Sequence, residues 1–286
     1  MKFVRYGAAG QECPGLIDAQ GKLRDLSAHI GDIDARVLAR TGRTQLAAID
    51  PASLPEVAGA PRYGAPVAHT GKMICVGLNY SDHAAETGVQ PPEQPILFMK
   101  ATNTIMGAND DVIIPKDSVK TDWEVELGVV IGDTARHVSV ADALNHVAGY
   151  LVVNDLSERA FQLEHGGQWV KGKSCDTFGP TGPWLLTADE VPDPQNLALW
   201  LEVNGHRYQD GNTRNMIFGV AELVSYISRY MTLQPGDIIS TGTPAGVGLG
   251  QKPPLYLRAG DVMELGITGL GRQRQRTVAY DEAVPA

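Results

Sequence analysis

Short apolar runs separated by turn residues dominate this chain, and they limit its fold more than any other feature. Such runs recur at KMICVGLNY, ILFMK, DVIIP, WEVELGVVI, GYLVVND, ALWLEVNG and DIISTG. A helical pattern of apolar residues spans 215–231 and stops before Pro235-Gly236. A shorter helix is expected between Ser139 and His146, because Ser139 and Asp142 resemble a capping box. Without regular strand–helix alternation, the sequence predicts an α+β, β-rich fold and not a doubly wound sheet.

The first 65 residues have a different character from the rest. MKFVRYG and ECPGLID are strand-like, DAQGK is a turn, and DIDARVLART is typical of a short helix. A stretch rich in Pro and Ala follows at 49–71, and it has the composition of a loose connector. We therefore expect a small N-terminal domain at residues 1–65 and a main domain at residues 66–286.

Net charge, apolar runs and cysteine content limit which binding partners are expected and in which cellular compartment the protein works. The formal net charge of −9 argues against a nucleic-acid partner. No run of 18 apolar residues is present, so no membrane span is expected, and the N-terminus lacks the apolar core of a signal peptide. Three cysteines without a CxxC pair are typical of reduced thiols. These features predict a cytoplasmic protein.

Three carboxylates stand where strands should fill a core. Glu124 and Glu126 are two residues apart and share one face of a strand, and Asp155 ends the next long apolar run. A strand with one solvent-exposed face would explain the pair. However, LGVVIG continues the strand with residues typical of burial on both faces, and like charges on one face repel. A divalent cation would compensate them. Oxygen ligands without His or Cys favour Mg²⁺ or Mn²⁺ over zinc. Ca²⁺ also binds such ligands, but it is expected less than Mg²⁺ or Mn²⁺.

Two further segments carry candidate chemistry. His83 and Glu86 are three residues apart, so a helical turn would place both on one face, where the carboxylate could orient the imidazole as a general base. An exposed polar turn is the alternative. The Pro-rich QPPEQP that follows, at 90–95, predicts a mobile flap. In QWVKGKSCDTFGP, Lys171 or Lys173 could supply a counter-charge or stabilise an oxyanion, although solvated lysines are the commoner case.

The late segment ISTGTPAGVGLG is rich in glycine. It lacks the pattern of a P-loop and of a dinucleotide-binding fingerprint. We interpret it as a loop whose backbone and Thr243 hydroxyl approach a ligand closely, with a tight strand connection as the alternative.

Taken in order, five motifs resemble the fumarylacetoacetate hydrolase superfamily. They are GLNYSDHAAETG, WEVELGVVIG, GYLVVNDLSERAFQ, WVKGKSCDTFGP and LQPGDIISTGTPAGVG. The chain is similar above all to the bacterial acylpyruvase-like and 2,4-diketo-3-deoxy-L-rhamnonate hydrolase branch, over about residues 70–275. The resemblance implies a β-rich roll of mixed sheets with few helices, and a homodimer.

The resemblance also implies roles for individual residues. The metal ligands of the family fall on Glu124, Glu126 and Asp155. Its His–Glu pair and its active-site lysine fall on His83, Glu86 and Lys173. Its substrate-binding residues fall on Arg159, Gln162 and Thr243.

The activity expected from these residues is Mg²⁺-dependent hydrolysis of the C3–C4 bond of a 2,4-diketo acid, which gives pyruvate and a carboxylic acid. The segment SERAFQLEHGGQWVKGKSCDTFGP is most similar to enzymes of sugar-acid catabolism, so 2,4-diketo-3-deoxy-L-rhamnonate or a close relative is the expected substrate. One alternative is a metal-dependent lyase or decarboxylase acting on oxaloacetate or ureidoglycolate. Another is a ligand-binding protein of the same fold without catalysis.

Overall fold

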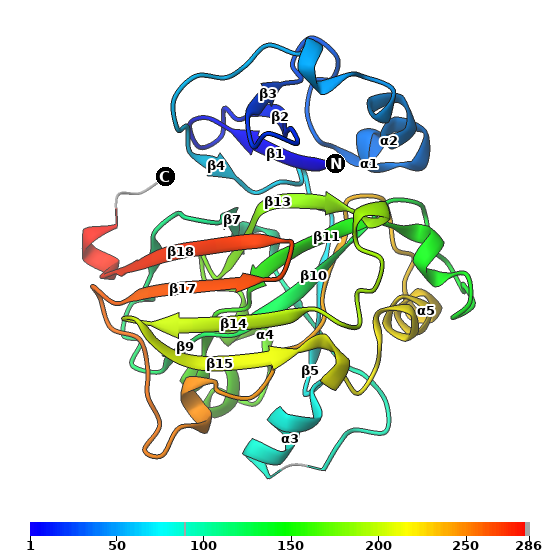
Figure 1. Cartoon of the computed structure of the whole chain (residues 1–286). Coiled ribbons are helices and arrows are strands. Elements are labelled where there is room, and N and C mark those ends of the chain that lie inside the picture. The colour runs from blue at the N-terminus through cyan, green and yellow to red at the C-terminus, as the bar shows by residue number, and fades with distance from the viewer. Residues whose placement is uncertain (89, 284–286) are drawn as a thin grey trace.

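The computed structural model describes residues 1–88 and 90–283, and it consists of mixed β-sheets with few helices (Figure 1). The expected α+β, β-rich fold is therefore confirmed. In the described part of the chain the large sheet has eleven strands, in the order β3-β2-β1-β13-β11-β10-β16-β5-β6, with β4 on β1 and β7 on β13. These strands are β1 (Lys2–Tyr6), β2 (Cys13–Ile17), β3 (Leu23–Asp25), β4 (Tyr63–Gly64), β5 (Met73–Gly77), β6 (Ile96–Lys100), β7 (Ile105–Gly107), β10 (Val125–Ile131), β11 (Val147–Asn154), β13 (Gly179–Thr187) and β16 (Ile238–Ser240).

Two smaller sheets complete the β-structure of the described residues. A five-stranded sheet has the order β15-β14-β17-β18-β8, and β9 pairs with β12. Their strands are β8 (Val112–Ile113), β9 (Thr121–Asp122), β12 (Ser157–Glu158), β14 (Ala198–Val203), β15 (His206–Asn212), β17 (Val262–Ile267) and β18 (Gly271–Val278). In Figure 1 the strands β14, β15, β17 and β18 run in front of β10, β11 and β13.

The helices are short and lie around the sheets. The α-helices are α1 (Ala35–Leu38), α2 (Arg40–Ala47), α3 (Ser81–Thr87), α4 (Val170–Lys173) and α5 (Val220–Tyr230). Single turns are η1 (Pro51–Ser53), η2 (Thr102–Thr104), η3 (Ala143–His146), η4 (Ala160–Glu164), η5 (Ala188–Glu190), η6 (Thr213–Asn215), η7 (Gly248–Gly250) and η8 (Tyr280–Glu282). Among the described residues, no helix is long and apolar enough to cross a membrane.

Alternation along β10 separates an apolar core from the candidate site. Val125 and Leu127 are buried in the core that also contains residues of the five-stranded sheet, such as Leu201 and Leu265. Glu126 is on the opposite face of the same strand, because successive strand residues point to opposite faces. Period-two alternation therefore directs Glu126 away from the apolar core between the two sheets.

The N-terminal residues continue the large sheet. Strand β1 pairs with β13 in antiparallel fashion, and Phe3 lies in the same buried cluster as Met73 and Leu151. The strands expected in MKFVRYG and ECPGLID are present as β1 and β2. The division into domains at residues 1–65 and 66–286 stays a prediction.

Two expected helices differ in extent from the structure. The helix expected at 215–231 is α5, which begins only at Val220. Gly219 is its N-cap residue, and the Gly219 N–H donates a hydrogen bond to Glu222 Oε2. The helix expected between Ser139 and His146 is reduced to the single turn η3, although Ser139 Oγ and the Asp142 N–H do make the expected local hydrogen bonds.

Close packing of α4 against β12 and η4 fixes one wall of the candidate site. Gly172 lies in α4, and a Cβ placed there would be 2.3 Å from the Glu158 carbonyl oxygen and 2.5 Å from the Gln162 nitrogen. Both neighbours are backbone atoms, so neither can rotate away. A glycine is therefore required for this approach.

Replacing this glycine tests the packing. Gly172→Ala should lower the free energy of unfolding by about 1–3 kcal/mol, the usual effect of overpacking, even though alanine favours helices. Urea unfolding measures the difference. Gly31→Ala is the matched control, since its added Cβ would meet no atom within 4 Å. Equal stability of Gly172→Ala and the wild type would contradict the packing argument.

Candidate metal centre and active site

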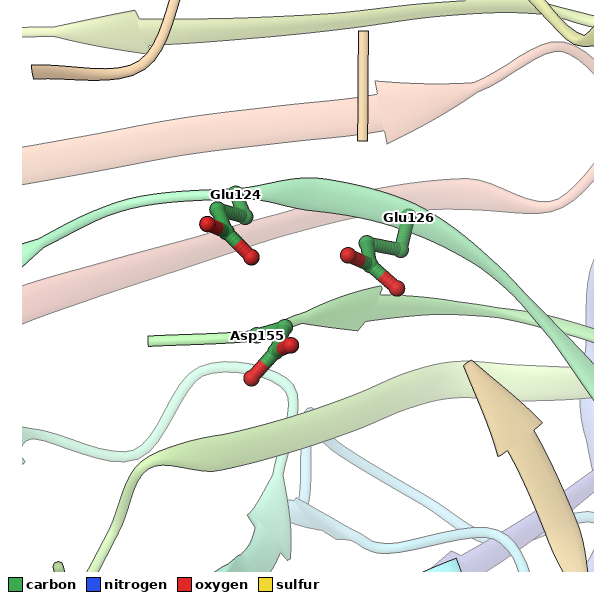
Figure 2. Close-up of side chains that lie close together, drawn as sticks. All are labelled: Glu124, Glu126 and Asp155. Carbon is green, nitrogen blue, oxygen red and sulfur yellow. The ribbon is translucent and has the colours of Figure 1, made fainter. Parts of the chain in front are cut away.

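The three acidic residues converge at adjacent strand ends (Figure 2). Val125 of β10 pairs with Asn154 of β11, and the Asp155 N–H donates to the Glu124 carbonyl oxygen at 2.9 Å. This register brings one carboxylate oxygen from each of Glu124, Glu126 and Asp155 within 4.8 Å of one another. The three side chains, here called the acidic triad, are buried, with exposures of 6%, 2% and 0%.

Two buried lysines neutralise part of this charge. Lys173 Nζ donates to Glu124 Oε2 at 2.7 Å and to Asp155 Oδ2 at 2.8 Å. Lys100 Nζ donates to Asp155 Oδ1 at 2.5 Å and to the Leu156 carbonyl oxygen at 2.9 Å. Burial opposes the charge on Lys173, but Asp155 and Glu124 raise its pKa, so the group stays an ammonium.

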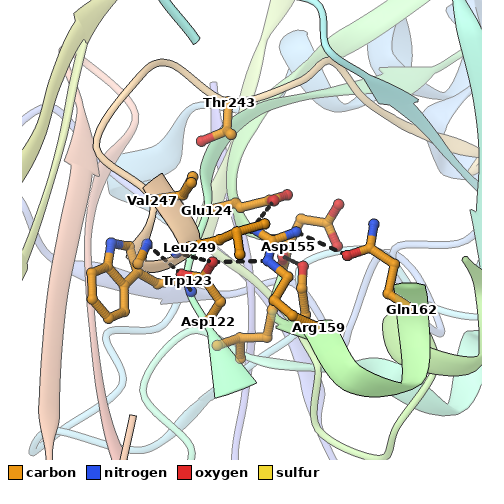
Figure 3. Close-up of polar contacts among 12 residues, drawn as sticks. Asp122, Trp123, Glu124, Asp155, Arg159, Gln162, Thr243, Val247 and Leu249 are labelled. Carbon is orange, nitrogen blue, oxygen red and sulfur yellow. Dashed lines mark hydrogen bonds and ion pairs between the residues drawn. The ribbon is translucent and has the colours of Figure 1, made fainter. Parts of the chain in front are cut away.

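Arg159 supports the triad from another side (Figure 3). Its Nη2 donates to Glu124 Oε1 at 2.6 Å, its Nε to Asp122 Oδ2 at 2.8 Å and its Nη1 to Gln162 Oε1 at 3.0 Å. Burial alone would raise the pKa of Glu124, but Lys173 and Arg159 lower it to about 2. Glu124 is therefore a carboxylate at neutral pH.

Glu126 has a different environment. Its Oε2 accepts from Ser240 Oγ at 2.5 Å and from the Gly242 N–H at 2.9 Å, while no hydrogen bond from another described residue reaches Oε1. Burial and the negative charges of Asp155 and Glu124 raise the pKa of Glu126 well above its usual value. Glu126 therefore takes up a proton more readily than an exposed glutamate does.

His83 and Glu86 form the expected pair. Both lie in α3, and His83 Nδ1 is 3.0 Å from Glu86 Oε2. The Gly246 N–H donates to Glu86 Oε1 at 2.9 Å, so the glycine-rich loop holds the carboxylate against the imidazole. His83 is buried, which rules out the alternative of an exposed polar turn.

Thr243 lies at the site in a supporting position. Its hydroxyl donates to the Val125 carbonyl oxygen at 2.9 Å and accepts from Gln209 Nε2 at 2.8 Å. Gln209 in turn accepts from the Val125 N–H at 2.9 Å. Thr243 therefore ties its loop to the first residue of β10, and it also borders the cavity described next.

One cavity of about 240 Å³ connects these groups. Its lining contains two residues of the triad, the histidine of the His–Glu pair, the lysine and the three substrate-binding candidates, together with many apolar side chains. The lining residues are Val76, Gly77, Leu78, His83, Phe98, Glu124, Glu126, Arg159, Gln162, Leu163, Trp169, Lys173, Thr243, Val247 and Leu249. Lys171, the other lysine candidate, is exposed, and its Nζ donates to the His165 carbonyl oxygen.

Sequence reasoning missed two charged residues of this site, Lys100 and Asp122. Both are buried. Asp122 accepts from the backbone N–H groups of Gly248 and Leu249 in addition to Arg159. Asp122 stands two residues before Glu124, so the same period-two rule could have included it. Lys100 ends the apolar run ILFMK, and a lysine in that position is a signal of a buried counter-charge.

The family of the chain follows from comparison with known proteins. The family model described as fumarylacetoacetate (FAA) hydrolase C-terminal matches residues 72–278. A protein of Burkholderia lata, named provisionally as a hydrolase with no stated substrate, is 62% identical over 278 residues, which are 97% of this chain and 99% of the relative.

Solved structures agree with this match. Fumarylacetoacetate hydrolase from psychrophilic Exiguobacterium antarcticum has a TM-score of 0.88 at 36% identity, over 98% of this chain and 99% of that chain. Maleylpyruvate hydrolase from Sphingobium sp. SYK-6, in complex with manganese(II) ion and pyruvate, has a TM-score of 0.80 at 28% identity, over 98% and 99% of the two chains. The chain therefore belongs to the fumarylacetoacetate hydrolase family.

Proposed function

We propose that this protein is a Mg²⁺-dependent hydrolase that cleaves the C3–C4 bond of a 2,4-diketo acid to give pyruvate and a carboxylic acid. One observation carries the proposal: Glu124 and Glu126 of the buried acidic triad border the same cavity as His83, which Glu86 orients. The manganese and pyruvate bound by the similar maleylpyruvate hydrolase support it, because pyruvate is a product of the proposed reaction.

The triad has the donors that a hard divalent cation requires. Glu124, Glu126 and Asp155 offer carboxylate oxygens, and each oxygen has lone pairs beyond those used by the lysines and Arg159. The pKa of Glu126 is raised first by burial and then by Asp155 and Glu124, and a cation beside these carboxylates would favour its ionised form. We propose these three residues as ligands of Mg²⁺, with Mn²⁺ as a substitute. The cation would supply Lewis-acid stabilisation of negative charge on the substrate.

His83 has the role of general base in this proposal. A carboxylate on Nδ1 favours the tautomer with its proton on Nδ1 and a lone pair on Nε2. His83 takes a proton from water, whose oxygen attacks the C4 carbonyl carbon. The C3–C4 bond then breaks, its electron pair passes to C3 as the enolate of pyruvate, and the second product leaves as a carboxylic acid. The enolate takes up a proton to give pyruvate.

Lys173 and Arg159 place positive charge around the reacting groups. Because the pKa of Lys173 is raised despite burial, through Asp155 and Glu124, its ammonium stabilises developing negative charge and does not act as a base. Arg159, Gln162 and Thr243 border the cavity and are proposed to orient the substrate.

Within this reaction class, we propose 2,4-diketo-3-deoxy-L-rhamnonate or a related sugar-derived acid as the substrate. The support is the similarity of SERAFQLEHGGQWVKGKSCDTFGP to enzymes of that group. Decarboxylation of oxaloacetate needs only stabilisation of an enolate, so it would leave the His83–Glu86 pair without a role. The homodimer stays a prediction.

The substitution Glu126→Gln removes the charge of Glu126 and tests two effects of that charge, on stability without metal and on metal binding. Its raised pKa, caused first by burial, means that the folded protein holds this proton more tightly than the unfolded chain does. The stability of the chelator-treated protein should therefore fall as pH rises above about 4.3, the ordinary Glu value. Glu126→Gln should remove this loss, and its thermal unfolding midpoint without metal should exceed that of the wild type increasingly above that pH.

Added Mn²⁺ should then raise the unfolding midpoint of the wild type and leave Glu126→Gln unchanged, because only the wild type has the complete triad. Chelator should abolish turnover of the wild type, and Mg²⁺ or Mn²⁺ should restore it. Glu93→Gln, at an exposed position, is the control and should follow the wild type. Full turnover by metal-stripped protein would refute the metal assignment.

Removing the imidazole distinguishes hydrolysis from decarboxylation. His83→Ala should lower kcat for diketo acid hydrolysis by roughly 10²- to 10⁴-fold, the usual effect of losing a general base. Oxaloacetate decarboxylation, which needs no attacking water, should fall less. His29→Ala, at an exposed position, is the control. If both reactions fell equally, His83 would not be the residue that activates water.

A further inference from the structure

We infer that the cavity selects diketo acids whose acyl group ends in an alkyl group, and that it discriminates against acyl groups ending in a carboxylate or a hydroxymethyl group. This inference rests on the proposed function. It comes from an apolar wall of the cavity, formed by Leu78, Phe98, Leu163, Trp169 and Leu249. None of these side chains is fully buried, so each has surface that a ligand can cover.

Helix α4 places this wall beside the charged base of the cavity. Trp169 is the N-cap residue of α4, and the Lys173 N–H donates to the Trp169 carbonyl oxygen at 3.1 Å. Residues four apart share a helix face and are separated by about 6 Å along the axis. Lys173 contacts the triad, whereas Trp169 is one turn away from it. A substrate whose carboxylate end lies at the triad therefore extends its acyl end toward Trp169.

Aromatic contacts hold this arrangement in place. Lys173 Nζ is 5.0 Å from the Phe98 ring centroid, and the Phe98 and Trp169 rings meet edge to face at 5.4 Å. A Cβ at Gly77 would be 2.5 Å from the Trp169 ring, so the absence of a side chain there permits the indole to reach its position. The rings form a continuous apolar surface that begins at the ammonium of Lys173.

Leu163 extends the wall to solvent. Its side chain is 47% exposed although it borders the cavity. It follows Gln162, whose side chain is buried against Arg159. The polar and apolar parts of the cavity thus meet between two successive residues of η4. Covering Leu163 with an alkyl group removes apolar surface from water, which is favourable.

The charges of the lining give the reason for rejecting an acidic acyl group. Among the described lining residues, the lysine and arginine side chains are those of Lys173 and Arg159. Both are already paired with carboxylates of the site. A second carboxylate on the substrate would lose hydration against the apolar wall without gaining a cation, which is unfavourable. A terminal hydroxyl would lose hydrogen bonds to water in the same place.

Cavity size limits the acyl group further. The volume of about 240 Å³ is below the roughly 300–1,000 Å³ of pockets for drug-sized ligands, so the acyl chain is short. Among sugar-derived diketo acids, those from 6-deoxy sugars end in a methyl group, and the others end in a hydroxymethyl group. The wall therefore favours the 6-deoxy class, to which the rhamnonate-derived acid belongs.

A set of matched substrates tests the inference on the Mg²⁺-loaded full chain, with kcat/KM measured from pyruvate release. From 2,4-dioxopentanoate to 2,4-dioxohexanoate the value should rise about fourfold, since a buried methylene contributes about 0.8 kcal/mol. 6-Hydroxy-2,4-dioxohexanoate, which ends in a hydroxymethyl group, should be at least about tenfold poorer than the isosteric 2,4-dioxoheptanoate. The acidic 2,4-dioxoheptanedioate should be poorer than 2,4-dioxoheptanoate by a similar factor or more.

A charge added to the wall should shift this preference. Leu163→Arg should raise the ratio of kcat/KM for 2,4-dioxoheptanedioate over 2,4-dioxoheptanoate by up to about fivefold, the effect of an exposed ion pair. Leu144→Arg is the matched control, because Leu144 is 44% exposed and lies outside the cavity lining. It should leave the ratio unchanged.

The outcomes separate the inference from the proposed function. If the wild type released pyruvate from 2,4-dioxoheptanedioate as well as from 2,4-dioxoheptanoate, or if both arginine variants shifted the ratio equally, the apolar wall would not set specificity and the hydrolase assignment would stand. If none of these acids released pyruvate, both proposals would be overturned.

Discussion

Like charge in the protein interior is the constraint on which the rest of this structure depends. The carboxylates of the triad share a small buried volume, and their repulsion is strong where water is largely excluded. Lys173, Lys100 and Arg159 offset part of it. Among the described residues, no lysine or arginine forms an ion pair with Glu126, and its pKa is raised by burial and by Asp155 and Glu124. A structure that served stability alone would not keep this arrangement.

The sheet topology makes this concentration of charge feasible. The antiparallel pairing of β10 with β11 places the triad at one end of the strands, and β16 lies on the other side of β10 and supplies Ser240. Lys100 comes from β6 and Lys173 from α4, so the counter-charges arrive from segments far apart in the sequence. These segments border one cavity, whose charged base and apolar wall meet along α4.

Local rules predicted the parts of the site that depend on local geometry. Period two along a strand placed Glu124 and Glu126 together, and the spacing of three in a helical turn placed His83 beside Glu86. The pairing of β10 with β11, which brings Asp155 to the other two, is not local, so spacing alone could suggest it without fixing it. The resemblance to the family selected Lys173 from two lysine candidates and added Arg159 and Gln162, and the structure places all three around the same cavity.

What the sequence did not predict depends on long-range contacts. Lys100 and Asp122 acquire their partners only when β6, η7 and Arg159 come together. Strands β13 and β18 contain Gly, Pro, Arg or Gln at positions where a simple alternation would require apolar residues. Buried amides explain one of them, since Gln273 of β18 donates to the Val152 and Gly182 carbonyl oxygens. Such pairs satisfy buried polar groups in ways that a residue pattern does not reveal.

Anomalous diffraction from crystals of the Mn²⁺-loaded protein is the most direct test of the central claim, that the triad is a metal centre. The account predicts a strong anomalous peak at roughly 2.0–2.2 Å, the distance of a small hard cation, from one oxygen of each of Glu124, Glu126 and Asp155. A protein that remained active under the same conditions with no peak at the triad, or with its manganese bound elsewhere, would contradict it.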